Sequence, residues 1–225
     1  MDDKRTLFRE FAEACRRKNF IIGQGNPEAK ILFIGKEPSR NVTNDYTFEC
    51  LDELNGKTFE DLWQVHDKGS EGATWSKYQK TIDRVYPERK HTAGKLDFEE
   101  MAFCTEMNNV CSLHTATADK STIADKRRLF HESGFIQSFP IVILACGDYI
   151  INQGDNRQID DTFGVEYHQE AFPNRRPNYW IHYAKDSNKP KLVIHTRQLS
   201  GPLSNEFVFS IGDTIREFLM EHNDL

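Results

Sequence analysis

The feature that most constrains the fold of this chain is a set of short, uninterrupted apolar runs. The strongest is IVILAC at 141–146, and shorter ones lie at 31–34 and at 192–194, within a strand expected at 191–194. A run without polar alternation is typical of a strand that is buried on both faces, as in a parallel sheet. Because both faces must then be covered, the sequence indicates an α/β protein.

Helical patterns separate these runs. We predict helices where apolar residues recur every three or four positions, at 6–19, 122–133 and 205–222. Residues 49–92 are expected to be mostly helical, and another strand is expected at 101–104. Together these elements predict a three-layer α/β/α fold with a central, mostly parallel, four-stranded sheet. We expect residues 1–225 to form a single domain.

Composition excludes several classes of protein. No apolar run approaches the ~18 residues of a membrane span, and no hydrophobic stretch follows the charged start as in a secretion signal. The five cysteines are odd in number and lack CxxC spacing, and the eight histidines form no HxH or HExxH pattern. We therefore expect a cytoplasmic protein with reduced thiols, no metal, no cofactor and no membrane partner.

Polar residues follow the predicted strands directly. Glu37 comes after the first strand, Asp148 after the third and His195 after the last, while Asn108 and Asn109 follow the second. In open α/β sheets, ligands bind at the carboxyl ends of the strands. The pattern alone therefore predicts a site that contains Glu37, His195 and one of the two asparagines.

Two of these segments resemble motifs of the uracil-DNA glycosylase superfamily. The segment GKEPS at 35–39 resembles the first motif, and HTRQLS at 195–200 resembles the second. Between them, Phe48, Asn109-Val110 and the segment IVILACGDYIINQG stand in the family's order, and a closing helix at 207–210 follows. The resemblance spans roughly residues 28–222 and implies a uracil-DNA glycosylase-like fold.

The resemblance also implies roles for individual residues. Glu37 would orient the attacking water and stabilise a cationic sugar, and His195 would donate a hydrogen bond to the leaving base. Phe48 would stack on the flipped base and Asn109 would read its edge, in a pocket that includes Gly35, Pro38 and Ser39. Leu199 would fill the gap left in the duplex. The remaining contacts to DNA would come from Lys36, Arg40, Arg197 and Ser200.

The chain departs from the family pattern at several of these positions. Glu37 replaces an aspartate, Ser39 replaces a tyrosine that blocks the thymine methyl group, and 196–198 replaces Pro-Ser-Pro. Lys36 adds a cation that either neutralises Glu37 or binds a phosphate. Three functions stay open: excision of uracil or a related damaged base from DNA, binding of nucleic acid or a nucleotide without excision, and catalysis on a free nucleobase or nucleoside.

The charge is distributed unevenly along the chain. The net charge of −6 argues against a protein that coats DNA non-specifically. Residues 171–200, however, hold one acid, Asp186, and six basic residues: Arg175, Arg176, Lys185, Lys189, Lys191 and Arg197. Because this stretch leads into the segment at His195, we expect it to form a DNA-facing edge whose binding is weak and salt-sensitive.

Overall fold

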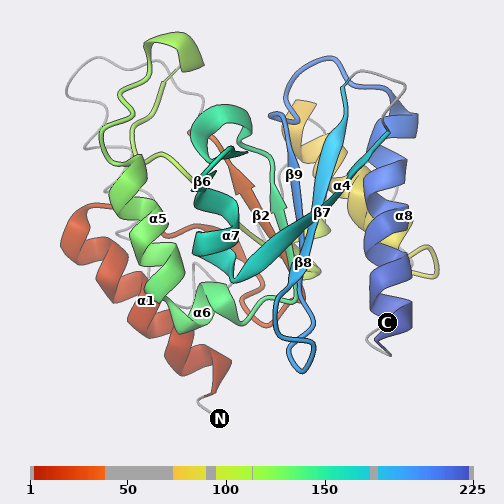
Figure 1. Cartoon of the computed structure of the whole chain (residues 1–225), viewed down its shortest axis with the longest axis horizontal. Coiled ribbons are helices and arrows are strands. Elements are labelled where there is room, and N and C mark those ends of the chain that lie inside the picture. The colour runs from red at the N-terminus through yellow and green to blue at the C-terminus, as the bar shows by residue number, and fades with distance from the viewer. Residues whose placement is uncertain (1–2, 39–72, 90–94, 113, 173–176, 223–225) are drawn as a thin grey trace.

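The computed structural model of this chain describes residues 3–38, 73–89, 95–112, 114–172 and 177–222 (Figure 1). Its described α-helices are α1 (Lys4–Lys18), α4 (Ala73–Val85), α5 (Ile123–Glu132), α6 (Gly134–Gln137), α7 (Gln158–Phe163) and α8 (Asn205–Glu221). Three short 3-10 helices are η1 (Phe98–Glu100), η2 (Thr115–Thr117) and η3 (Gly147–Tyr149). The described strands are β1 (Gln24–Gly25), β2 (Ile31–Gly35), β3 (Ala102–Glu106), β4 (Ile141–Leu144), β5 (Asn152–Gln153), β6 (Asn156–Arg157), β7 (Val165–Ala171), β8 (Tyr179–Ala184) and β9 (Leu192–Thr196).

The large sheet contains seven of the described strands, in the order β1-β3-β2-β4-β9-β8-β7. Its four central strands, β3, β2, β4 and β9, are parallel to their neighbours. These are the four strands that the apolar runs predict, so the α/β class and the parallel centre are confirmed. β5 and β6 form a separate antiparallel pair.

The predicted total of four strands is wrong, because β1, β8 and β7 extend the sheet in antiparallel pairing. β7 exposes most of its residues to solvent, so its sequence VEYHQEA carries no continuous apolar run. Antiparallel strands at a sheet margin need only one buried face, or none, and their sequences are correspondingly polar. This is why apolar runs reveal the centre of the sheet but not its margin.

The sheet has a hydrophobic layer on each face, because alternate residues of a strand point to opposite sides. Leu32, Ile34 and Val193 pack on one side with α1, α5, α6 and α7, and we call this side the α7 face. Ile31, Phe33 and Ile194 pack on the other side with α4 and α8, and we call it the α8 face. Figure 1 shows α1, α5, α6 and α7 on one side of the sheet and α8 on the other.

The helices predicted from periodicity agree with the structure to within two residues at each end. Residues 49–92 are only partly described: α4 accounts for 73–85, a turn follows, and 49–72 and 90–92 lie outside the described residues. Three of the described helices begin with a side chain that accepts a backbone hydrogen bond: Asp3 for α1, Ser133 for α6 and Ser204 for α8. Such caps satisfy N–H groups that the helix itself leaves without an acceptor.

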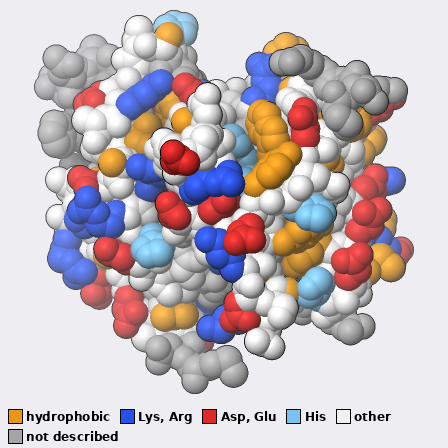
Figure 2. Space-filling view, in the orientation of Figure 1, with side chains coloured by type: hydrophobic (Ala, Val, Ile, Leu, Met, Phe, Trp, Pro, Cys, Tyr) orange, Lys and Arg blue, Asp and Glu red, His pale blue; other side chains and the backbone are white. Residues whose placement is uncertain are grey.

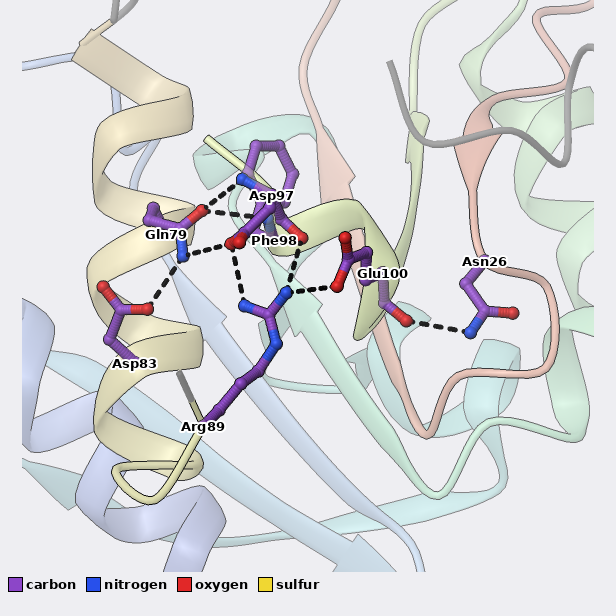
Figure 3. A network of polar contacts seen from close by, with 7 residues as sticks. All are labelled: Asn26, Gln79, Asp83, Arg89, Asp97, Phe98 and Glu100. Carbon is purple, nitrogen blue, oxygen red and sulfur yellow. Dashed lines mark hydrogen bonds and ion pairs between the residues drawn. The ribbon is translucent and has the colours of Figure 1, made fainter. Parts of the chain in front are cut away.

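A buried glutamine joins α4 to the start of β3. Gln79 is 4% exposed, and its Oε1 accepts hydrogen bonds from the backbone N–H groups of Asp97 and Phe98, both at 2.8 Å. Its Nε2 donates to the carboxylates of Asp83 and Asp97. Arg89 also donates to Asp97, at 2.7 Å (Figure 3). This network fixes α4 against the segment that leads into β3.

We predict that Gln79→Leu lowers the free energy of unfolding by about 2–4 kcal/mol, because two buried N–H groups lose their acceptor. Urea denaturation followed by circular dichroism measures this change. Gln169→Leu is the matched control, since Gln169 lies exposed on β7, and it should change the value by less than about 0.5 kcal/mol. Equal effects of the two substitutions would contradict a structural role for the network.

Candidate functional site

The carboxyl ends of the four parallel strands meet at one edge of the sheet. Parallel pairing aligns Gly35 with Glu106 and Leu144 with His195, so the residues that follow these strands come together. Glu37 follows β2, Glu106 ends β3, and His195 lies near the end of β9. Glu37 and His195 thus both lie at this edge, at the ends of β2 and β9. We call this region the carboxyl edge.

Glu106, which sequence reasoning missed, forms a carboxylate pair with Glu37. Burial, followed by the negative charge of Glu37, raises the pKa of Glu106 to about 8. Its Oε2 atom is buried and accepts no hydrogen bond from the described residues. Glu37 is buried, at 6% exposure, while Glu106 as a whole residue is half-buried. The two acids therefore share one low-dielectric environment in which Glu106 holds its proton at neutral pH.

The glycine of the first motif makes room for this pair. A Cβ atom on Gly35 would lie 2.2 Å from Oε2 of Glu106, which is far inside van der Waals contact. Gly35 therefore lets the Glu106 carboxyl group lie over the backbone of β2. The position of Glu106 at the end of a predicted strand, next to the motif strand, is the sequence signal that would have revealed it.

Lys36 does not neutralise Glu37 by direct pairing, because its ammonium group lies 3.0 Å from Asp148 Oδ1. It also lies over the ring of Tyr149, 4.7 Å from the ring centre. Burial of Asp148 opposes its ionisation, but the hydrogen bond and charge of Lys36, with the charge of Lys120, lower the pKa of Asp148. The Lys36 side chain is only 12% exposed, which leaves little of it for the expected contact with DNA.

His195 is buried beside β8 and is neutral. Its Nε2 lies 2.8 Å from the carbonyl oxygen of Gly147, and a carbonyl can only accept, so Nε2 carries the proton. The imidazole ring stacks on Trp180, with 5.2 Å between ring centres. Burial lowers the pKa of His195 to about 4, against the opposing effect of the Gly147 hydrogen bond. His195 is thus a neutral donor at physiological pH.

The side-chain amide of Asn109 makes hydrogen bonds to other residues of the protein at both its oxygen and its nitrogen. Its Oδ1 accepts from the backbone N–H of Ile21 at 3.0 Å and from Nζ of Lys126 at 3.1 Å. Its Nδ2 donates to Oγ1 of Thr122 at 3.2 Å, and Asn108 is likewise bound, to the carbonyl of Asp119. Both asparagines are buried. This geometry does not support the expected contact between Asn109 and a base, because both ends of its amide already have partners.

Leu199 is fully buried in the hydrophobic layer of the α8 face. A residue that fills a gap in a duplex must project from the surface, so the expected wedge role of Leu199 is wrong for this conformation. Arg197 and Ser200 are exposed beside it, and Pro38 is half-buried. The remaining expected contacts, Ser39, Arg40 and Phe48, lie outside the described residues.

The basic stretch is divided between the two ends of the sheet. Lys185 and Lys189 are exposed between β8 and β9, and because β9 begins after them they lie at the end opposite the carboxyl edge. Lys191 is buried and donates to the carbonyl of Gln137 at 2.9 Å. Arg175 and Arg176 lie outside the described residues. The prediction that these basic residues form one continuous DNA-facing edge is therefore wrong for those that the structure describes. Among them, Arg197 lies at the carboxyl edge.

Comparison with models of known protein families gives no match for this chain, and comparison with the curated proteins finds no significant relative. Within the described ranges, no group of three or more His, Cys, Asp or Glu side chains could hold a metal ion. None of the helices described is long and apolar enough to cross a membrane. Cys15 and Cys146 are free thiols.

We predict that NMR titration of the Glu106 carboxyl carbon gives a pKa near 8, and that Glu37→Gln lowers it because a neighbouring negative charge is removed. Glu132→Gln is the control, since Glu132 is exposed at the end of α5 and should leave the Glu106 pKa unchanged. A Glu106 pKa near 4.5 in the unsubstituted protein would contradict the buried carboxylate pair.

Glu106 should also make stability depend on pH. Its pKa is higher in the folded state than in the unfolded state, so between about pH 4.5 and 8 the folded state binds more protons. Its contribution to the free energy of unfolding is therefore full below this window and decreases as pH rises through it. We expect Glu106→Gln to be more stable relative to the unsubstituted protein at pH 8.5 than at pH 5, as measured by urea denaturation at both values.

Proposed function

We propose that this protein is a DNA glycosylase-like hydrolase that removes uracil or a related damaged base from DNA. The observation that carries the proposal is the pair of Glu37 and Glu106 at the carboxyl edge, with the neutral His195 two strands away from Glu37. The motif resemblance of the segments 35–39 and 195–200 supports it. The reaction breaks the bond between C1′ and the base nitrogen, and water supplies the new hydroxyl group.

The carboxylate pair suits the sugar side of this reaction. Burial, followed by the nearby Glu37, raises the pKa of Glu106 to about 8, so Glu106 keeps its proton at neutral pH. A charged carboxylate stabilises the positive charge that develops on the sugar and accepts a proton from the attacking water. Two acids whose environments separate their protonation states are typical of acid–base catalysis. In this proposal Glu37 is the catalytic carboxylate and Glu106 a proton-bearing neighbour.

His195 suits the side of the leaving base. A neutral imidazole donates a hydrogen bond from Nε2 to an oxygen of the base as negative charge develops there. In the structure this hydrogen bond goes to the Gly147 carbonyl, so the base oxygen would replace that carbonyl as acceptor. β4 lies between β2 and β9, which separates the backbones that carry Glu37 and His195 by about 10 Å. A nucleotide bound across the edge would lie between them.

The test is cleavage of uracil-containing oligonucleotides, single- and double-stranded, by alkali after incubation with the protein. We predict abasic product with the unsubstituted protein and at least a ~100-fold lower rate with Glu37→Gln, because a positioned base typically contributes that much. Glu132→Gln at the opposite end of the sheet should retain the rate. Absence of abasic product at stoichiometric protein and low salt would overturn the proposal.

The positions of Asn109 and Leu199 favour a second function. Asn109 is expected to read a base and Leu199 to fill the gap in the duplex, but the Asn109 amide is hydrogen-bonded within the protein and Leu199 is buried. In this alternative the chain binds nucleic acid or a nucleotide at the carboxyl edge without excising a base. Binding would then be unchanged in Glu37→Gln, and neither form would release a base. The cleavage assay and a binding assay on the same oligonucleotides separate the two functions.

Both functions predict that exposed Arg197 contacts a phosphate. Arg197→Ala should weaken binding of a single-stranded oligonucleotide and reduce the salt dependence of log K by about one phosphate contact. Lys185→Ala removes an exposed cation at the opposite end of the sheet and should leave affinity unchanged. Fluorescence anisotropy at several salt concentrations measures both effects. Equal losses in the two variants would indicate non-specific attraction and no site at the carboxyl edge.

A further inference from the structure

A separate pocket lies on the α7 face of the sheet, with a volume of about 370 Å³. It lies between the β5-β6 pair with α7 and the strands β7, β8 and β9. Figure 2 shows hydrophobic and histidine side chains gathered over β7 and β8 on this side of the molecule. Its volume is within the range of small-molecule sites. Glu106 points to the α8 face with Ala102 of its strand, so the carboxylate pair does not line this pocket.

An Asp–His pair forms part of the pocket wall. Nδ1 of His182 lies 3.1 Å from Oδ1 of Asp160, and the same oxygen accepts from Nδ2 of Asn152 at 2.7 Å. Because the carboxylate oxygen accepts, Nδ1 of His182 carries the proton. Burial lowers the pKa of His182 more than Asp160 raises it. The ring is therefore neutral, and its Nε2 atom presents a lone pair.

This lone pair has no partner within the described residues. His182 is 1% exposed, and its Nε2 is buried and makes no hydrogen bond there. A buried acceptor without a donor costs stability. Since His182 lines the pocket, a molecule that carries an N–H or O–H group could satisfy Nε2 from inside it. The hydrogen bond to Asp160 fixes the orientation of the ring and leaves Nε2 as the ring nitrogen that can accept from a ligand.

Two aromatic side chains, Trp180 and Tyr167, form part of the remaining wall. Trp180 is half-buried and stacks on His195, and Tyr167, 46% exposed, lies edge-on to His182 with 5.7 Å between ring centres. Arg157 also lines the pocket, with Nε 3.9 Å from Oδ2 of Asp160. Aromatic walls favour a planar ligand, which can stack on them or contact their edges. The aromatic side chains favour a planar ring, and Nε2 of His182 favours a ligand that donates an N–H group. A planar ring with an N–H group meets both requirements.

We propose that this pocket binds a free planar heterocycle of the nucleobase class, with a ring N–H donated to Nε2 of His182 and the ring held by Trp180 and Tyr167. The site is additional to the carboxyl edge and requires no excision of a base. His195 lines the pocket and also lies at the carboxyl edge. A heterocycle in the pocket would therefore lie next to the imidazole ring that the proposed reaction uses.

The test is isothermal titration of the whole chain with uracil and with 1,3-dimethyluracil. The two compounds share the ring, but the second has no N–H group. We expect uracil to bind at least 10-fold more tightly than 1,3-dimethyluracil. In ¹⁵N spectra of the imidazoles, uracil should shift the Nε2 signal of His182 while Nδ1 keeps its proton. Equal affinities for the two compounds, or no binding of uracil at millimolar concentration, would overturn the proposal.

His182→Asn separates the two ends of the imidazole. The asparagine amide can donate to Asp160 in place of Nδ1, but it has no group at the position of Nε2. We expect at least a 10-fold loss of uracil affinity in this variant. His168→Asn is the control, because His168 is exposed on β7 and contacts Tyr183 instead; it should bind uracil normally. A folded His182→Asn variant with unchanged affinity would refute the assignment.

Two further measurements keep the result interpretable. Trp180→Leu, at a half-buried position, provides a second variant if His182→Asn fails to fold. We expect it to weaken uracil binding at least 10-fold. Unchanged affinity would overturn the proposed role of Trp180 in holding the ring. The ¹⁵N shift of His182 and the affinity of His182→Asn report on the pocket, whereas cleavage of oligonucleotides reports on the carboxyl edge. Failure of one experiment therefore does not imply failure of the other.

Discussion

Parallel pairing of β3, β2, β4 and β9 is the constraint on which the rest of this structure depends. These strands are buried on both faces, by α1, α5, α6 and α7 on one side and by α4 and α8 on the other. Because all four run in the same direction, their carboxyl ends meet at one edge. The polar residues after each strand are brought together by this arrangement, although the chain separates Glu37 from His195 by more than half its length.

The ionisable groups at this edge owe their properties to burial as much as to proximity. Glu106 keeps a proton because it is desolvated and lies near Glu37, and His195 stays neutral because it is desolvated between Trp180 and Gly147. The cation Lys36 is held by Asp148. Glu37, a protonated Glu106 and a neutral imidazole thus lie at one edge of the sheet, where we propose acid–base chemistry.

The two faces of the sheet separate the polar groups into two places. Alternation along β3 sends Glu106 to the α8 face, whereas alternation along β8 and β9 sends Trp180, His182 and His195 to the α7 face. The pocket on the α7 face exists because β8 and β7 continue the sheet beyond β9 and because α7 with the β5-β6 pair covers them. His195 lies at the boundary, which connects the proposed reaction with the proposed heterocycle site.

The sequence by itself determined the α/β class, the four parallel strands and the convergence of Glu37 and His195, because continuous apolar runs and the residues that follow them are local features. Only the tertiary structure decided which of the candidate side chains are accessible to a ligand. Asn109 and Leu199 carry suitable chemistry, but contacts with distant residues such as Ile21 and the core of the α8 face commit them to the fold. The apolar-run pattern does not reveal β7 because most of its residues are exposed, and it does not reveal β8 because the sequence YWIHYA is interrupted by a polar histidine. The basic residues are close together in the sequence. Lys185 precedes β9 and Arg197 follows it, however, so the length of this strand places the two residues at opposite ends of the sheet.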